Sequence, residues 1–158
     1  MKEERQVSVV IEKEPPRQPG VLRLLEQSDA YAQSLYPAES NHLVDVSTLE
    51  KPSVAFFVAR HEGAIVGCCA LVDAGDGTAE IKRMFVDLQA RGLKIGRKLL
   101  EGVESHGRDT GLSAIRLETG IHQPEAIGLY KTAGYVEIGP FGFYQPDPLS
   151  MFMEKKIG

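Results

Sequence analysis

A short basic segment rich in glycine has the residue types that bind phosphate. It reads Arg91-Gly92-Leu93-Lys94-Ile95-Gly96-Arg97 and stands between a strand-like run and a helix-like run. Free backbone N–H groups at the start of a helix, together with the positive end of its dipole, favour bound anions. Gly92 and Gly96 let a ligand approach the backbone closely, and the cationic side chains add charge. We therefore expect an anionic cofactor here, and a diphosphate suits the segment best.

Two other phosphate-binding patterns do not fit this segment. It lacks the GxxxxGK[ST] of a nucleotide P-loop. It also lacks GxGxxG, and the strands before it have the pattern of antiparallel strands, whereas a dinucleotide fold needs parallel ones. Taken alone, the segment is also compatible with an ordinary solvated first turn of a helix.

The overall composition is typical of one globular domain, which we expect to span residues 1–158. Hydrophobic residues make up 42% of the chain and charged residues 25%. No apolar run approaches the roughly 18–20 residues that cross a bilayer, and the N-terminus lacks the apolar region of a signal peptide. Cys68 and Cys69 are adjacent and poorly placed to form a disulfide with each other, and no metal-ligand spacing is present. These features predict a cytoplasmic protein without a metal and without membrane contact.

The charge is unevenly distributed along the chain. The formal net charge is −4, yet six cations lie close together in sequence: Lys82, Arg83, Arg91, Lys94, Arg97 and Lys98. An acidic chain with its cations concentrated in one segment favours a small anionic ligand over a nucleic acid. A nucleic-acid binder remains an alternative, opposed by the acidic total and by the lack of an aromatic stacking platform.

The hydrophobic pattern predicts the elements that position this segment. Strands are expected at residues 7–11, 54–59, 64–72, 79–86, 114–118, 135–138 and 151–154, and helices at 21–35, 94–110 and 124–133. Residues 41–49 show no clear periodicity. This order predicts an α/β (α+β) fold, in which helices pack on one mixed sheet.

Two segments resemble motifs of the GNAT acetyltransferases. The basic segment is similar to the family's R/Q-x-x-G-x-G/A motif, which binds the pyrophosphate of coenzyme A, with Lys94 in place of the middle glycine. The second segment is Gln123-Pro124-Glu125-Ala126-Ile127-Gly128-Leu129-Tyr130-Lys131-Thr132-Ala133-Gly134-Tyr135. It resembles the family's N-x-x-A-x-x-L-Y-x-x-x-G-F, with Gln123 for Asn and Tyr135 for Phe. The resemblance extends over residues 54–154 and is most specific over 80–135.

The resemblance implies a fold, a reaction and a set of cofactor contacts. The fold would be a single mixed, mostly antiparallel sheet of about six to seven strands with helices on both faces. The reaction would be acetyl transfer from acetyl-CoA to the amine of a small molecule, directly within a ternary complex. The implied cofactor-binding residues are Met84, Phe85, Val86, Arg91, Gly92, Leu93, Lys94, Ile95, Gly96, Arg97, Gln123 and Ala126. Backbone amides of residues 84–86 would hold the pantetheine arm and the thioester carbonyl. Residues 139–150 resemble a branch of the family without an assigned substrate.

The resemblance also suggests catalytic residues. Tyr130 matches the tyrosine that protonates the departing thiolate, although a tyrosine on an amphipathic helix can also be a core residue. Glu80 stands where histone-acetylating members carry a general base, and a salt bridge with Lys82 or Arg83 is its alternative role. Three further residues are weaker candidates for the base: Glu118, His122 and Tyr144.

The acceptor site and two other properties are less constrained. Lys82 and Arg83 could bind a carboxylate-bearing acceptor, and the aromatic residues 141, 143 and 144 could line an acceptor pocket or cover the sheet edge. A non-catalytic acyl-CoA-binding regulatory module is the alternative function; the departures at Lys94 and Gln123 favour it, whereas the presence of Glu80 and Tyr130 opposes it. A homodimer is an expectation from the family alone.

Overall fold

The computed structural model describes residues 8–41, 43–90 and 92–158. Its elements in chain order are β1 (Val9–Lys13), α1 (Pro19–Leu35), the 3-10 turn η2 (Ala38–Ser40), α2 (Val46–Leu49), β2 (Val54–His61), β3 (Ala64–Asp73), β4 (Thr78–Val86), α3 (Ile95–Asp109), β5 (Ala114–Gly120), α4 (Pro124–Thr132), β6 (Val136–Ile138) and β7 (Ser150–Lys156). Every predicted element is present with ends close to those expected. The predicted start of the first strand, Val7, lies outside the described residues.

The predicted sheet is confirmed. Seven strands form one sheet in the order β1-β2-β3-β4-β5-β7-β6. Only the β4–β5 pair is parallel, because α3 crosses over between these two strands, and every other neighbouring pair is antiparallel. Two short elements, η2 and α2, were not predicted. The single turn α2 is capped by the Asp45 carboxylate, which accepts a hydrogen bond from the Thr48 backbone N–H at 2.9 Å.

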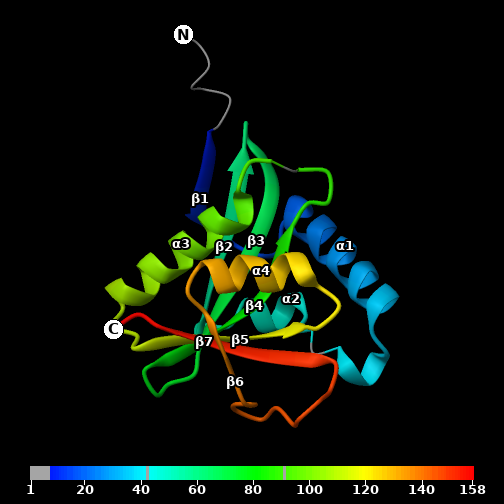
Figure 1. The fold of residues 1–158 in the computed structure, drawn as a ribbon. Helices are drawn as coiled ribbons and strands as arrows, with labels where there is room; N and C mark the ends of the chain where they lie inside the picture. The colour runs from blue at the N-terminus through cyan, green and yellow to red at the C-terminus, as the bar shows by residue number, and fades with distance from the viewer. Residues whose placement is uncertain (1–7, 42, 91) are drawn as a thin grey trace.

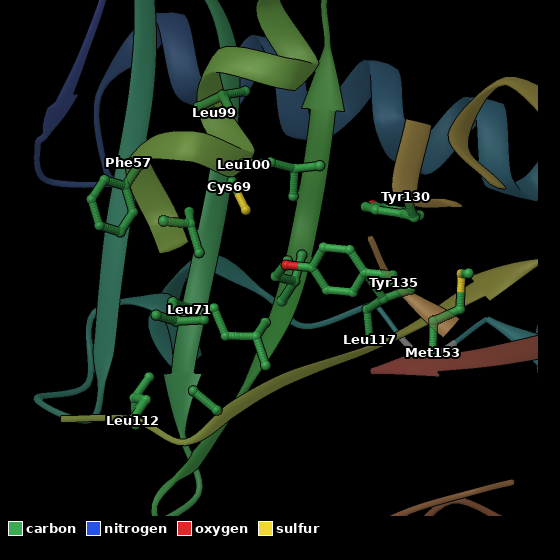
Figure 2. Packing of buried hydrophobic residues seen from close by; sticks show 14 of the residues in the cluster. Phe57, Cys69, Leu71, Leu99, Leu100, Leu112, Leu117, Tyr130, Tyr135 and Met153 are labelled. Atoms are coloured by element: carbon green, nitrogen blue, oxygen red, sulfur yellow. The ribbon is translucent and has the colours of Figure 1, made fainter. Parts of the chain in front are cut away.

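Helices cover both faces of the sheet, as Figure 1 shows. Successive side chains of a strand point to opposite faces, so β2 and β3 contribute to two separate cores. Phe57 and Cys69 pack with α3 and α4, whereas Phe56 and Cys68 pack with α1 and α2. Figure 2 shows the first core, in which Leu99 and other buried residues of α3 lie over the central strands. None of the helices among the described residues is long and apolar enough to cross a membrane.

The two central strands β4 and β5 pair only over their first halves. Their register runs from the Thr78–Ala114 pair to the Ile81–Leu117 pair and then ends. Beyond that point β4 stays paired with β3 up to Val86, and β5 stays paired with β7 up to Gly120. The sheet therefore opens between the two strands, and the backbone of the second half of β4 faces this opening instead of another strand.

A β-bulge lies in β4 beside this opening. Cys68 of β3 pairs with Phe85 and Ala70 pairs with Lys82, so Arg83 and Met84 together stand opposite one residue. Arg83 has a φ of 54°, in the left-handed region that side chains other than glycine rarely adopt. Its guanidinium turns toward α1, where it donates to the Asp29 carboxylate at 2.7 Å and to the Leu25 carbonyl at 3.3 Å. The bulge thus fastens α1 to the strand that borders the opening.

Candidate active site

A cleft of about 1150 Å³ occupies the opening between β4 and β5. One wall comes from α4 and the start of α3, the opposite wall from α1 and the residues that follow it, and the floor from the diverging strands. Eight of the predicted cofactor-binding residues line it: Met84, Phe85, Val86, Lys94, Gly96, Arg97, Gln123 and Ala126. The fold therefore brings both motif segments to one cleft.

Three further predicted cofactor residues, Gly92, Leu93 and Ile95, are not in the cleft lining. The Ile95 side chain is only 3% exposed and belongs to the core beneath α3, so only its backbone could meet a ligand. Gly92 and Leu93 precede the helix and are not part of the cleft lining, and Leu93 packs against the core. Arg91 lies outside the described residues.

Lys94 adopts the backbone conformation that the missing glycine would provide. It is the N-cap of α3, with φ 56° and ψ 37° in the left-handed region. A lysine in this region costs about 1–2 kcal/mol, but the chain still turns into the helix. The free N–H groups of the first turn of α3 therefore lie at the cleft, and the departure from the motif does not block the backbone path.

Gly96 has a packing role as well. A Cβ at this position would lie 2.9 Å from the Leu129 Cδ2 and 3.6 Å from the Met84 Cε. The absence of a side chain lets the start of α3 approach α4 closely, so the two motif segments are held against each other.

Lys94→Gly should separate the two contributions of this residue. We expect the free energy of unfolding to change by less than about 1 kcal/mol, because relief of the left-handed strain opposes the greater entropy of glycine in the unfolded chain. We expect the Kd for acetyl-CoA to rise by roughly two- to fivefold, because one cation near the anionic cofactor is lost. Denaturant unfolding and calorimetric titration measure the two effects. An unchanged Kd would show that the Lys94 ammonium does not contact the cofactor.

Tyr130 is the buried tyrosine at the cleft. It lies on α4, is 5% exposed and lines the cleft through the atoms that remain accessible. No hydrogen bond joins its hydroxyl to another residue of the part of the chain that the structure describes. Burial raises the pKa of Tyr130 well above its ordinary value, so the phenol keeps its proton at neutral pH. Tyr130 thus places a neutral phenol in the wall of the cleft.

Tyr135 is a neighbouring tyrosine with a different environment. Its ring meets that of Tyr130 edge to face, with centroids 5.8 Å apart, and both are labelled in Figure 2. The Tyr135 hydroxyl donates to the Glu104 carboxylate at 3.0 Å, and Lys155 donates to the same carboxylate at 2.8 Å. Tyr135 is therefore held by a buried polar network and does not line the cleft.

Glu80 lies in a polar cluster beside the cleft. Its carboxylate accepts a hydrogen bond from the Tyr144 hydroxyl and lies 3.4 Å from the Lys82 ammonium. Lys82 also donates to the Tyr144 hydroxyl and lies over its ring at 4.9 Å from the centroid. Burial, and then the bond to Glu80, raise the pKa of Tyr144. Glu80 is not among the lining residues, and it forms the salt bridge that was its alternative role.

Among the other candidates for the base, only Glu118 lines the cleft. It stands on β5 just past the last β4–β5 pair and accepts a hydrogen bond from the Ser150 Oγ at 2.6 Å. The His122 ring stacks on Tyr36 at 5.4 Å between centroids, and the His122 backbone N–H donates to the Tyr36 hydroxyl at 2.9 Å. His122 thus helps to hold the cleft wall.

The expected acceptor contacts are met only in part. Lys82 and Arg83 both line the cleft, but the Arg83 guanidinium already donates hydrogen bonds to Asp29 and Leu25 of α1. Phe141 and Tyr144 pack on Phe152 outside the cleft lining, and Phe143 is fully exposed. Phe141 and Tyr144 therefore cover part of the sheet, which was the alternative role of that loop, whereas Phe143 neither lines the cleft nor covers the sheet.

The sequence did not predict one wall of the cleft. Ser28, Tyr31 and Ala32 of α1 line it, followed by Tyr36 and by residues 40, 41 and 43. The spacing 28, 31, 32 places these side chains on one side of a helix. This spacing is visible in the sequence, but the buried side of the same helix explains its apolar pattern equally well.

Comparison with known proteins identifies the family. The pattern described as the Acetyltransferase (GNAT) family matches residues 21–135. The chain therefore belongs to the GNAT acetyltransferase family. It is an acyl-CoA-dependent N-acetyltransferase, with acetyl-CoA as the donor and the amine of a small molecule as the acceptor.

Individual relatives agree with this assignment. An IAA acetyltransferase of Azospirillum brasilense is 52% identical over 151 residues, covering 95% of this chain and 99% of that protein. A Klebsiella pneumoniae protein, provisionally named an acyl-CoA N-acyltransferase, has a crystal structure with a TM-score of 0.85 and 37% identity, over 96% of this chain and 99% of that one. The PaiA N-acetyltransferase of Thermoplasma acidophilum, solved with coenzyme A, shares the fold at 17% identity and a TM-score of 0.73, over 94% and 99% of the two chains.

Proposed function

We propose that the cleft between β4 and β5 holds acetyl-CoA and the acceptor amine together and that the acetyl group passes directly from one to the other. The observation that carries this proposal is the convergence of both motif segments, Tyr130 and Glu118 on one cleft. Tyr130 belongs to the α4 wall, and Glu118 stands on β5 across the opening from β4.

The cofactor would lie along the second half of β4. Residues 84–86 lack a partner strand on the β5 side, so their backbone groups can pair with the amides of the pantetheine arm. The first turn of α3 offers N–H groups and a positive dipole end to the pyrophosphate. Lys94 and Arg97 add positive charge at the same end of the cleft.

The reaction needs one proton acceptor and one proton donor. The neutral amine attacks the thioester carbonyl, and the amine loses a proton as the new C–N bond forms. The C–S bond then breaks, and the departing thiolate takes up a proton. We assign the donor role to Tyr130 and the acceptor role to Glu118. Glu118 is preferred to Glu80 because Glu118 lines the cleft and Glu80 does not.

The cysteines support direct transfer. Cys68 and Cys69 are fully buried and do not line the cleft. Burial raises the pKa of the Cys68 thiol to about 12 and also raises that of Cys69, so both stay protonated and unreactive at neutral pH. An acyl-cysteine intermediate is therefore not part of the proposed mechanism. The same free thiols are consistent with the proposed cytoplasmic location.

Ligand-dependent stability tests the cofactor site. Acetyl-CoA at about 100-fold over its Kd should stabilise the fold by about 2.7 kcal/mol, which raises the Tm of a domain of this size by several degrees. Neutralising Arg91 and Arg97 together should remove most of this shift. Differential scanning calorimetry measures it, with acetate as the control ligand. No shift at millimolar acetyl-CoA would contradict the placement of the cofactor.

A further inference from the structure

We propose that the second half of α1, residues 26–36, is a brace across the opening between β4 and β5, and that Arg83 and Tyr36 are the two residues that position it. The brace keeps the cleft open before acetyl-CoA binds. This inference rests on the proposed function, because it concerns how that cleft is prepared for its cofactor. It comes from contacts that join α1 to both strands beyond the point where they separate.

The two halves of α1 are held in different ways. The buried residues of the helix, Val21, Leu24 and Leu25, all lie in its first half, where they pack with β2 and β3. Residues 26–36 contain no fully buried side chain. The second half of the helix therefore depends for its position on polar and partly exposed contacts.

Arg83 forms the contact with β4, just beyond the last β4–β5 pair. Its side chain is only 3% exposed, and the guanidinium donates to the Asp29 carboxylate at 2.7 Å. Hydrogen bonds between charged groups are among the stronger contacts in proteins. The ion pair of Arg23 with Asp87 also joins α1 to the end of β4, but Arg23 is 48% exposed, and such a pair contributes little. Arg83 is therefore the main polar contact of the brace with β4.

Tyr36, the C-cap residue of α1, forms the contact with β5. Its hydroxyl accepts a hydrogen bond from the His122 backbone N–H at 2.9 Å, and its ring stacks on the His122 ring. A Cβ on Gly120, the last residue of β5, would collide with this hydroxyl. Tyr36 and the end of β5 thus fit closely against each other, and Figure 1 shows the C-terminal end of α1 near the end of β5.

The length of helix between the two contacts suits the opening. Asp29 and Tyr36 are seven positions apart in the sequence, which corresponds to about 10 Å along a helix. Paired strands lie about 4.8 Å apart, so this length is about two strand spacings. A gap of two spacings has room for one extended chain between β4 and β5, and the pantetheine arm is such a chain. The brace therefore keeps the two strands apart by the width that the cofactor needs.

Distance measurements between the two strand ends test the brace without any turnover. Spin labels are attached to Leu88→Cys and Ile121→Cys, which follow β4 and β5 and replace residues that are 45% and 41% exposed. The native thiols of Cys68 and Cys69 are fully buried and stay unlabelled. Double electron–electron resonance then gives the distribution of distances across the opening. We expect a narrow distribution that acetyl-CoA leaves unchanged.

Release of either end of the brace should broaden this distribution. Arg83→Gly removes the guanidinium, and glycine accepts the left-handed φ of 54° at this position. Tyr36→Ala removes the contact with β5. Because the brace needs both ends, the double variant should be no broader than the broader of the two single variants. Each single variant should raise the Kd for acetyl-CoA by about three- to tenfold, because the cleft then has the binding width for only part of the time.

Arg17→Ala is the matched control for these variants. It removes another arginine–carboxylate pair beside α1, the one with Glu50, and both residues lie outside the cleft lining. This variant should leave the distance distribution and the Kd for acetyl-CoA unchanged. The same broadening in Arg17→Ala would show a general loosening of α1 and would overturn the brace.

The remaining outcomes are equally decisive. A wild-type distribution in Arg83→Gly or in Tyr36→Ala overturns the brace, and a broadened distribution with an unchanged Kd overturns its role in preparing the cofactor site. If either variant does not fold, Asp29→Ala or Gly120→Ala releases the same contact from its other partner. If acetyl-CoA does not bind to the wild type, the proposed function fails, whereas the distances in the protein without cofactor still decide whether the brace exists.

Discussion

Replacement of Tyr130 by phenylalanine should lower kcat by roughly 10²–10⁴-fold and leave the Kd for acetyl-CoA close to that of the wild type. We propose the buried phenol of Tyr130 as the proton donor, and its raised pKa keeps the proton in place throughout the neutral range. Phenylalanine preserves the packing against Tyr135 and removes only the hydroxyl. The thiolate must then leave without a positioned proton. Single-turnover rates and calorimetric titration measure the two quantities.

Tyr135→Phe is the matched control for this experiment. It also removes a phenol from a buried ring, but from one that donates to Glu104 and lies outside the cleft lining. We expect it to lower the free energy of unfolding by about 1–3 kcal/mol while kcat changes less than about tenfold. Equal kcat values for Tyr130→Phe and the wild type would remove Tyr130 from the mechanism. Equal losses in both variants would point to packing of the tyrosine pair instead of proton donation.

Replacement of Glu118 by glutamine should lower kcat/KM at neutral pH by about 10²-fold or more. The amide keeps the size of the side chain and its contact with Ser150 but cannot take up a proton. The loss should shrink as the pH rises, because hydroxide can then take up the proton that the attacking amine releases. A pH profile of kcat/KM for both proteins measures this recovery.

Glu80→Gln distinguishes the two carboxylates. Glu80 accepts from Tyr144 and pairs with Lys82 beside the cleft, so we expect a loss of stability of about 1–3 kcal/mol and less than about a tenfold fall in kcat. If Glu80→Gln shows the large, pH-dependent loss and Glu118→Gln does not, then Glu80 is the base, as its position along the strand first suggested.

Local sequence patterns were enough to predict the order of the main elements, the cofactor and the family of this protein. The alternating and helical hydrophobic patterns predicted the order of the main elements, because burial of apolar faces depends mostly on side chains near in sequence. The two motif segments predicted the cofactor and the family. Tyr130 was predicted as the proton donor from its place in the second motif, a role that the Tyr130→Phe experiment tests. Even the departure at Lys94 preserved the backbone turn, since its φ of 56° is the conformation a glycine would adopt.

The tertiary structure alone decided which charged side chains meet the cleft. Glu80 and Glu118 are both strand carboxylates, and their sequence neighbours do not reveal that Tyr144, from a distant loop, engages the first of them. The divergence of β4 from β5 depends on where these two neighbouring strands, which α3 separates in the chain, stop pairing. The cleft wall around Tyr31 depends on how α1 packs across the sheet. Each of these features arises from contacts between segments far apart in the chain, whose geometry is set by the packing of the whole domain.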